Sequence, residues 1–163
     1  MVHSMASGLL FSGTNVLSLD DKGRIALPVK YRQLIKESCD GECYLAKSLF
    51  DECLWLYTKP QWDELVDSFT ALNTVSQTAL RSIQRTLLGS AVYCKLDAQG
   101  RILIPQELRS LCLLEKKATL IGINNKFEIW SETCLDRQRI KDAEVLQNLS
   151  DSAILNELAS IAL

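Results

Sequence analysis

A ten-residue motif occurs twice in this chain, and the duplication constrains the fold more than any other feature of the sequence. Residues 19–28 read LDDKGRIALP and residues 96–105 read LDAQGRILIP, so Leu, Asp, Gly, Arg, Ile and Pro recur in register. A second match aligns residues 54–57 with 127–130 at a slightly shorter spacing. Because two copies are too few for a solenoid, the sequence predicts two half-length units of one design.

Each unit has the same predicted order of elements: strand, strand, helix, strand, strand. An apolar stretch precedes the polar turn of the motif and another follows it, which is the pattern of a β-hairpin. Gly23 and Gly100 lie where such a turn requires a positive φ, and Pro28 and Pro105 fit the first turn of a helix. The predicted strands are residues 14–19, 25–27, 43–46 and 53–57 in the first unit and 92–96, 102–104, 118–123 and 127–130 in the second.

Helical spacing of apolar residues predicts the other elements. Residues 62–72 and 80–87 form a helical hairpin between the units, with Gly89 placed to end it. Residues 131–149 have helical propensity, and an apolar stripe at 154–161 predicts either a terminal helix that packs or a frayed end. The short helix of each unit has an apolar face, formed by Tyr31, Leu34 and Ile35 in the first copy and by Leu108, Leu111 and Cys112 in the second. The predicted fold class is α+β.

Composition narrows the classes of function. The chain has 18 Lys and Arg residues against 20 Asp and Glu residues, a net charge of −2 and 47% hydrophobic residues, which indicates a globular protein and not a polybasic nucleic-acid coat. It has no apolar run of the roughly 18 residues that span a bilayer, and no export leader is recognisable. The six cysteines are scattered through apolar runs, which favours reduced thiols over disulfides. We therefore expect a cytoplasmic protein without a membrane segment.

Enzymatic motifs are missing from the sequence. The single histidine, His3, falls within residues 1–10, which we interpret as an N-terminal extension or an expression remnant, and there is no Gly-rich phosphate loop. Cys39, Cys43 and Cys53 are candidate metal ligands. No second pair or histidine completes a metal site, so thiols packed in the core are the preferred interpretation. We expect no catalytic residue, metal, cofactor or small-molecule substrate.

The turns of the repeated motif hold charges in a suggestive arrangement. Each has an Asp four residues before an Arg, at Asp20 and Arg24 and again at Asp97 and Arg101. One interpretation is an ion pair that only fixes the turn, and the other is an oriented guanidinium offered to guanine or phosphate in DNA. The spacing alone leaves both open. Lys22 adds charge to the first turn where the second has a glutamine, which favours Arg24 over Arg101 as the DNA contact.

Other basic residues have simpler explanations. Lys30 and Arg32 would reach phosphates from the short helix, but a solvated helix face is the preferred interpretation. Arg81 and Arg85 lie one turn apart on the second linking helix, where pairing with an acidic residue of the facing helix, such as Asp63 or Asp67, is favoured over a DNA contact. The three tryptophans occupy core-like positions, so base stacking is not expected.

The ordered set of motifs resembles the MraZ family of bacterial proteins over about residues 11–149. The resemblance rests on Leu-Asp-x-Lys-Gly-Arg at 19–24, Arg-x-x-Gln-Arg-x-Leu-Leu-Gly at 81–89, Leu-Asp-x-x-Gly-Arg at 96–101 and Asn-Lys-Phe-Glu-Ile-Trp at 125–130. It implies two tandem AbrB-like ββαββ hemi-domains that form a pseudo-symmetric swapped-hairpin barrel with a linking helical hairpin. The implied divisions are the extension at 1–10, the first hemi-domain at 11–58, the linking helices at 59–90, the second hemi-domain at 91–131 and the C-terminal helix and tail at 132–163.

The same resemblance implies a function. MraZ proteins are sequence-specific transcriptional regulators that assemble into rings and bind direct repeats upstream of their own cluster of division and cell-wall genes. The resemblance therefore implies a homo-oligomer on double-stranded promoter DNA, in the cytoplasm at the nucleoid. The implied DNA-binding residues are Lys22, Arg24 and Arg101, and the implied turn-shaping residues are Asp20, Gly23, Asp97 and Gly100.

Two other classes of function stay open at this point. One is an oligomeric, ring-forming interaction protein with no specific DNA site, in which the Asp–Arg pairs are structural, and an enzyme ranks third. A mildly acidic chain with few basic residues in each turn should bind DNA weakly as a monomer. A ring that places identical turns on successive repeats would resolve this, because avidity can gain factors of roughly 10² to 10⁴.

Overall fold

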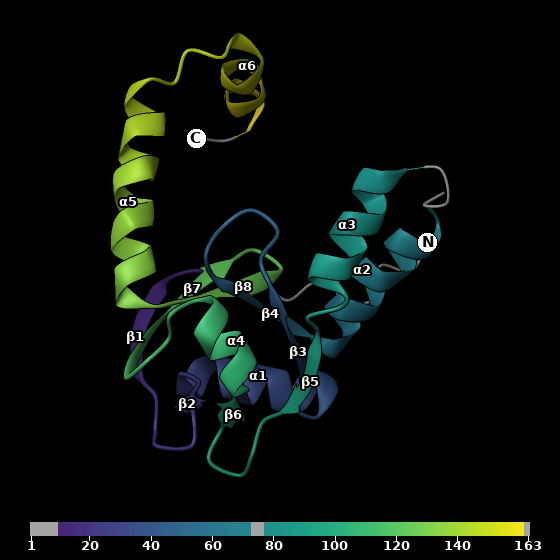
Figure 1. Cartoon of the computed structure of the whole chain (residues 1–163), viewed down its shortest axis with the longest axis vertical. Coiled ribbons are helices and arrows are strands. Elements are labelled where there is room, and N and C mark those ends of the chain that lie inside the picture. Colours follow the sequence, from purple (N-terminus) through teal and green to yellow (C-terminus); the bar gives the residue numbers. More distant parts are fainter. Residues whose placement is uncertain (1–9, 73–76, 162–163) are drawn as a thin grey trace.

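The computed structural model of the chain describes residues 10–72 and 77–161, and in this part it has the predicted strands and helices (Figure 1). The strands are β1 (Thr14–Ser18), β2 (Arg24–Ala26), β3 (Glu42–Lys47), β4 (Leu54–Thr58), β5 (Val92–Lys95), β6 (Arg101–Leu103), β7 (Lys117–Ile123) and β8 (Lys126–Trp130). The helices are α1 (Val29–Cys39), α2 (Lys59–Thr70), α3 (Thr78–Leu87), α4 (Gln106–Leu111), α5 (Glu132–Gln147) and α6 (Ser152–Ser160). The α+β class predicted from the sequence is confirmed.

The strands form a six-stranded antiparallel sheet and a separate two-stranded ribbon. The sheet has the order β1-β7-β8-β4-β3-β5, and the ribbon pairs β2 with β6. Trp55 lies opposite Glu128 where β4 meets β8, and Ile25 lies opposite Ile102 in the ribbon. Since β1, β3 and β4 correspond to β5, β7 and β8 in the repeat, this order is symmetric. The pseudo-two-fold axis that relates the repeats passes through the Trp55–Glu128 pair and the Ile25–Ile102 pair.

The first two strands of each repeat do not form the local hairpin that the sequence predicts. Instead, β1 pairs with β7 of the second repeat and β5 pairs with β3 of the first. In each repeat the two predicted strands therefore separate beyond their turn. The first, at 14–19 or 92–96, joins the sheet, and the second, at 25–27 or 102–104, joins the ribbon. Strands β2 and β6 have three residues each, so either one can form only a short ladder of hydrogen bonds with a partner. Pairing β2 with β6 places Ile25 and Ile102 in one core.

The other two hairpins are as predicted. β3 pairs with β4, and β7 pairs with β8 through a turn in which Asn124 has a φ of 60°. Asparagine tolerates this left-handed conformation better than most residues, which is why the Asn-Asn pair marks a turn in the sequence.

Alternation along the central strand β4 divides its side chains between two cores. Leu54 and Leu56 face the core between the sheet and the ribbon, whereas Trp55 and Tyr57 face the opposite core beneath α2, α3 and the start of α5. All five residues of β4 are buried, as expected for a strand covered on both faces. The ribbon is held to the first core by Ile25, which has no exposed surface and contributes about 1.5–3 kcal/mol by its burial.

The short helices α1 and α4 cover the ribbon side of the sheet with narrower apolar faces than predicted. Tyr31 and Ile35 of α1 and Leu108 of α4 are buried. Leu34 and Leu111 are 42% and 56% exposed, so their predicted place on the buried face is wrong. The buried stripe of α1 runs through positions four residues apart, and Leu34 lies to one side of that stripe.

The linking hairpin of α2 and α3 and the first turn of α5 cover the same face of the sheet, with the hairpin on the right of Figure 1 and α5 rising on the left and leading to α6. The first turn of α5 is anchored by Cys134 and Leu135, which are buried. Further along, Ile140, Val145 and Leu146 are each more than 60% exposed. Within the described residues, none of the helices has both the length and the apolar character needed to cross a membrane.

Candidate nucleic-acid interface

The turn between β1 and β2 is built around the carboxylate of Asp20. Its Oδ1 accepts hydrogen bonds from the backbone N–H of Lys22 at 3.0 Å and of Arg24 at 2.9 Å, and its Oδ2 accepts one from Arg24 Nε at 2.6 Å. The N–H of Gly23 donates to the carbonyl oxygen of Asp20 at 2.9 Å. Gly23 has a φ of 84°, a conformation that glycine adopts without the strain that a Cβ would cause. One carboxylate therefore fixes both the backbone of the turn and the arginine that follows it.

The turn between β5 and β6 repeats this arrangement. Asp97 Oδ1 accepts from the N–H groups of Gln99 and Arg101, both at 2.9 Å, and Asp97 Oδ2 accepts from Arg101 Nε at 2.8 Å. Gly100 has a φ of 73° and donates its N–H to the Asp97 carbonyl at 2.9 Å. The Asp-x-x-x-Arg spacing found in the sequence thus produces the same local structure in both repeats.

The hydrogen bonds hold both aspartates in the charged form. The backbone N–H of Arg24 is the largest influence on Asp20, followed among the stabilising contacts by the Arg24 side chain, and together they lower the pKa of Asp20 below its ordinary value. The backbone and side chain of Arg101 lower the pKa of Asp97 in the same way. Each turn therefore keeps a carboxylate beside its guanidinium at neutral pH.

The guanidinium groups of Arg24 and Arg101 differ in how many of their nitrogen atoms form hydrogen bonds. Arg24 bonds to Asp20 through Nε, and its Nη groups have no hydrogen-bond partner among residues 10–72 and 77–161. Arg101 also bonds through Nε, but its Nη2 donates to Gln99 Oε1 at 3.3 Å. The ion pair that fixes the turn is thus present in both repeats, and in the first repeat it leaves the two terminal nitrogens of the fork available to a ligand.

The ribbon places the two arginines on one surface. Along β2 and β6, Ile25 and Ile102 point into the core, and the alternation of a strand turns Arg24 and Arg101 to the outer face. Both turns project from the same end of the molecule, opposite α6 (Figure 1). Lys22 is exposed on the first of these turns. The predicted DNA-binding residues are therefore brought together, although they are far apart in the sequence.

Arg32 does not lie on a solvated helix face as the sequence predicts. Its Nε donates to the carbonyl oxygen of Leu27 and its Nη1 to that of Gln99, both at 3.0 Å. The matching Arg109 donates from Nε to the carbonyl oxygen of Ile104 at 2.9 Å. The signal that could have identified these residues is their recurrence at the same place after the two prolines. The sequence does not reveal the contact of Arg32, because the acceptor of its Nη1 is a backbone carbonyl of the other repeat.

Charged residues of both linking helices make contacts within their own helix. Asp63 pairs with Lys59 of its own helix at 2.6 Å, and Arg81 donates from Nη2 to Thr78 Oγ1 at 3.1 Å. Whether Arg81 and Arg85 also pair with Asp63 or Asp67 of the facing helix stays a prediction. Lys59 lies one helical turn before Asp63, so its ammonium reaches the carboxylate without spanning two helices.

The candidate metal ligands are separated. Cys43 on β3 and Cys53 just before β4 are buried free thiols, and burial raises the pKa of each well above its ordinary value. Among residues 10–72 and 77–161, no group of His, Cys, Asp and Glu side chains is arranged to hold a metal ion. His3 lies outside the described residues.

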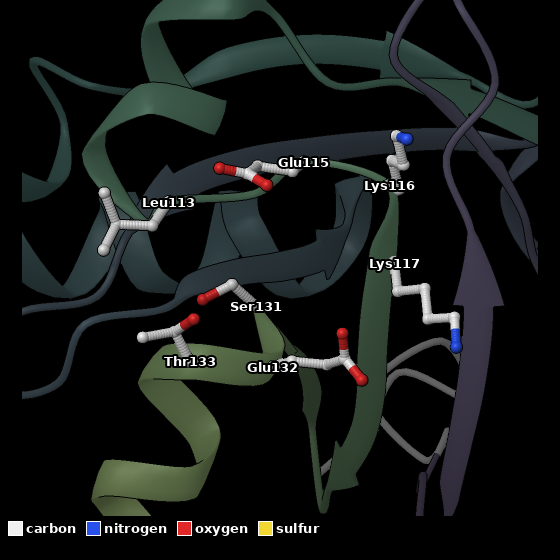
Figure 2. Close-up of a pocket in the computed structure, with 7 residues that line it drawn as sticks. All are labelled: Leu113, Glu115, Lys116, Lys117, Ser131, Glu132 and Thr133. Carbon is white, nitrogen blue, oxygen red and sulfur yellow. The ribbon is translucent and has the colours of Figure 1, made fainter.

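A hollow of about 250 Å³ beside the start of α5 does not form a built binding site (Figure 2). Lys116 and Lys117 line it, but Figure 2 shows both side chains directed away from Ser131 and Thr133 at the helix N-terminus. Glu132 adds a negative charge at the same place. The cations therefore do not converge with the helix N-terminus on a common ligand position.

The fold and the turns define a class of protein: an α+β chain of two interlocked repeats that presents a pair of Asp-oriented arginines on the outer face of a β-ribbon. The sequence matches the family model described as "MraZ protein, putative antitoxin-like" over residues 10–85 and 87–156, so the match spans both repeats. The chain belongs to the MraZ family, as the resemblance of its motifs predicts.

Relatives named "Transcriptional regulator MraZ" cover most of the chain. The one from Methylococcus capsulatus is 45% identical over 130 residues, which is 80% of this chain and 84% of the relative. The one from Nitrosococcus oceani is 39% identical over 154 residues, 94% of this chain and 100% of the relative. The one from Pseudoalteromonas translucida is 42% identical over 142 residues, 87% of this chain and 92% of the relative. These relatives are named for regulation and not for a catalysed reaction.

Proposed function

We propose that this protein is a sequence-specific, DNA-binding transcriptional regulator. The observation that carries the proposal is the outer face of the ribbon, where Arg24 and Arg101 lie on one surface and each is oriented by an aspartate. A two-stranded ribbon that offers side chains from its outer face is an established way to enter a DNA groove. The names of the relatives support the same class of function.

In this proposal the residues of the turns have separate roles. The free Nη groups of Arg24 bind the O6 and N7 acceptors of guanine, a bidentate contact that discriminates against other bases by about 1–3 kcal/mol. Arg101 makes the equivalent contact from the second turn, and Lys22 binds phosphate. Asp20 and Asp97, with Gly23 and Gly100, shape the turns and hold the arginines in position.

Charge alone does not make either turn a strong DNA ligand. In the first turn Asp20 and Asp21 balance Lys22 and Arg24, and in the second turn Asp97 balances Arg101. Long-range attraction to phosphate is therefore weak, and affinity must come from oriented contacts repeated many times. This favours a homo-oligomer in which each subunit places its turns on one copy of a repeated DNA sequence.

Exposed apolar residues support self-association of the subunit. Ile140, Val145 and Leu146 of α5 and Ile154 and Leu155 of α6 are between 43% and 69% exposed. Apolar surface that is gathered on terminal helices and left uncovered in the subunit is typical of an interface. We propose that these helices contribute to a ring of subunits, and that the ring binds direct repeats upstream of the protein's own cluster of division and cell-wall genes. The protein would then act in the cytoplasm at the nucleoid.

The exchange of strands between the repeats supports the finer description of the fold. β1 joins the second repeat and β5 joins the first, while β2 and β6 pair at the centre. We propose that the subunit is the pseudo-symmetric swapped-hairpin barrel of AbrB-like proteins, formed within one chain by its two hemi-domains.

The test is a fluorescence-anisotropy titration of the whole protein against the duplex upstream of its own gene, beside a shuffled duplex of equal length, at two salt concentrations. We expect tighter binding to the native duplex, and we expect this preference to persist at the higher salt because base contacts do not depend on counterion release. Equal binding to both duplexes that disappears at the higher salt would contradict the proposal.

The second candidate is an oligomeric interaction protein with no specific DNA site. It is favoured by the completeness of the Asp–Arg networks, which fix both turns without any ligand. It predicts a stable ring and no preference between the native and shuffled duplexes, so the same titration separates the two candidates.

A further inference from the structure

Each turn is covered by an arginine that belongs to the other repeat. Arg32 of α1 lies against Gly100, where a Cβ would come within 2.4 Å of the arginine Cδ. Arg109 of α4 lies against Gly23, where a Cβ would come within 2.6 Å of the arginine Cζ. Both glycines are therefore needed for the close approach of these side chains as well as for their positive φ. The contact is reciprocal, as the pseudo-symmetry of the fold requires.

Hydrogen bonds make the two contacts unequal. Arg32 bridges the repeats, since its Nε donates to the Leu27 carbonyl of its own repeat and its Nη1 to the Gln99 carbonyl of the other. Arg109 donates only from Nε to the Ile104 carbonyl of its own repeat, and within the described residues its Nη groups have no acceptor. Each turn is joined to the other repeat by a backbone hydrogen bond, from the Leu27 N–H to the Gly100 carbonyl at 3.0 Å and from the Ile104 N–H to the Gly23 carbonyl at 2.9 Å. The second turn is also tied to the opposite helix by a charged hydrogen bond, whereas Arg109 only packs against the first.

We propose that Arg32 and Arg109 are positioning residues that hold each DNA-binding turn from the opposite repeat, with Arg32 holding its turn more tightly. The internal network of Asp97 fixes the shape of the second turn, and the Leu27 N–H ties the turn to the ribbon by donating to the Gly100 carbonyl at 3.0 Å. Arg32 adds a tie to α1, which is anchored by the buried Tyr31 and Ile35. The two turns consequently keep a constant separation and orientation, which two base contacts on one DNA site require.

Hydrogen exchange of the ring without DNA tests the positioning role directly. In Arg32→Lys the charge stays, but one ammonium cannot reproduce the geometry in which Nε and Nη1 reach two carbonyls. We expect the amides of Gln99, Gly100 and Arg101 to exchange about tenfold faster, the factor that the loss of one charged hydrogen bond predicts. The amides of residues 22–24 should keep their rates. Arg109→Lys should do the converse with a smaller effect.

The matched control is Arg139→Lys on the exposed part of α5, which should leave both turns unchanged. Unchanged exchange of the second turn in Arg32→Lys would overturn the proposal. Equal acceleration of both turns and of the buried strand β4 would also overturn it, because that result describes loss of global stability and not release of one turn.

DNA binding gives a second readout, which rests on the proposed function. If Arg32 acted as a phosphate contact, lysine would replace it and affinity for the native duplex would be kept. A positioning role predicts that Arg32→Lys binds about tenfold more weakly, with an unchanged slope of log K against log salt. Full affinity would overturn the proposal. Failure of the wild-type ring to prefer the native duplex would refute the proposed function, while the exchange experiment would still decide the positioning role.

Discussion

The two turns share a backbone and differ in what surrounds it. In both, one aspartate accepts two backbone N–H groups and one guanidinium Nε, with a glycine at positive φ between them. The first turn adds Lys22 and leaves the Nη groups of Arg24 unbound. The second has Gln99 in place of the lysine, and Gln99 engages Arg101 through its side chain and Arg32 through its carbonyl.

The difference shows which positions the turn itself requires. Asp, Gly and Arg recur because their contacts form the turn, whereas the two exposed residues between Asp and Gly changed from Asp21 and Lys22 to Ala98 and Gln99. Exposed positions can diverge without a cost in folding, and here the divergence gives the two turns different charges and different hydrogen bonds. We expect the first turn to do more of the DNA recognition and the second to be the more rigid.

The largest effect should come from removing the two arginines in turn. Arg24→Ala is expected to abolish specific binding, a loss of 100-fold or more for the proposed ring, since a bidentate contact worth roughly 1–3 kcal/mol would be lost in every subunit. Arg101→Ala should weaken binding less, because part of its guanidinium is already engaged by Gln99. Anisotropy with the native duplex measures both, and light scattering should show intact assemblies. Normal affinity of Arg24→Ala would discard its role.

Alanine at the two glycines tests the unequal contacts by stability. Each substitution places a Cβ at positive φ, which costs about 1–3 kcal/mol in the free energy of unfolding. Gly100→Ala should be the more destabilising, because the Arg32 side chain that it meets is held by two hydrogen bonds. Arg109, opposite Gly23, is held by one and can move aside. Urea denaturation measures the difference. Equal losses in the free energy of unfolding would argue against the proposal that Arg32 holds its turn more tightly than Arg109.

The pH dependence should be the same for both turns. The pKa values of Asp20 and Asp97 are below 3.8 in the folded protein, with the backbone N–H of the following arginine as the main cause. Their contribution to stability is therefore complete above the unfolded pKa near 3.8 and is lost as the pH falls through the lower folded values. Carboxyl NMR titration should give both midpoints below 3.8. A midpoint at or above 3.8 for one aspartate would show that its turn is not formed in solution.

Exchanging the exposed residues should have the smallest effect. Lys22→Gln is expected to leave sequence preference intact and to reduce the magnitude of the salt slope by about 0.9 for each subunit that loses a phosphate contact. Gln99→Lys should increase that slope if the second turn also approaches the backbone of DNA. Titrations at four salt concentrations measure the slopes. An unchanged slope in Lys22→Gln would remove Lys22 from the interface.

The sequence predicted elements and turns well because those depend on local chemistry. Gly23 and Pro28 marked a turn and a helix start that the structure contains, and the Asp–Arg spacing led to the observed ion pairs. The continuous apolar run at residues 54–57 likewise matches the buried strand β4. Whether the turns contact DNA stays a prediction, since the geometry supports that role without testing it.

The pairing of strands could not be predicted from the residues alone. A turn with apolar runs on both sides is the same sequence whether its strands pair locally or separate into the two halves of the molecule. Arg32 illustrates the same limit: its acceptor is the carbonyl of Gln99, a backbone atom that no residue pattern reveals. The pairing of Asp63 with Lys59 was not predicted either, although the two residues lie one helical turn apart, a spacing that brings their side chains together.

The strand exchange also dictates when the protein can fold during its synthesis. β1 is made early, yet its partner β7 lies roughly 100 residues further along the chain, a separation that makes contact formation slow. The ribosome adds about 5–20 residues per second, so the first repeat waits several seconds with its edge uncovered. Neither repeat can finish alone, and we expect the sheet to close only when nearly the whole polypeptide has emerged. Folding and completion of the chain are thus tied together, and a truncated product would not accumulate as a half-working regulator.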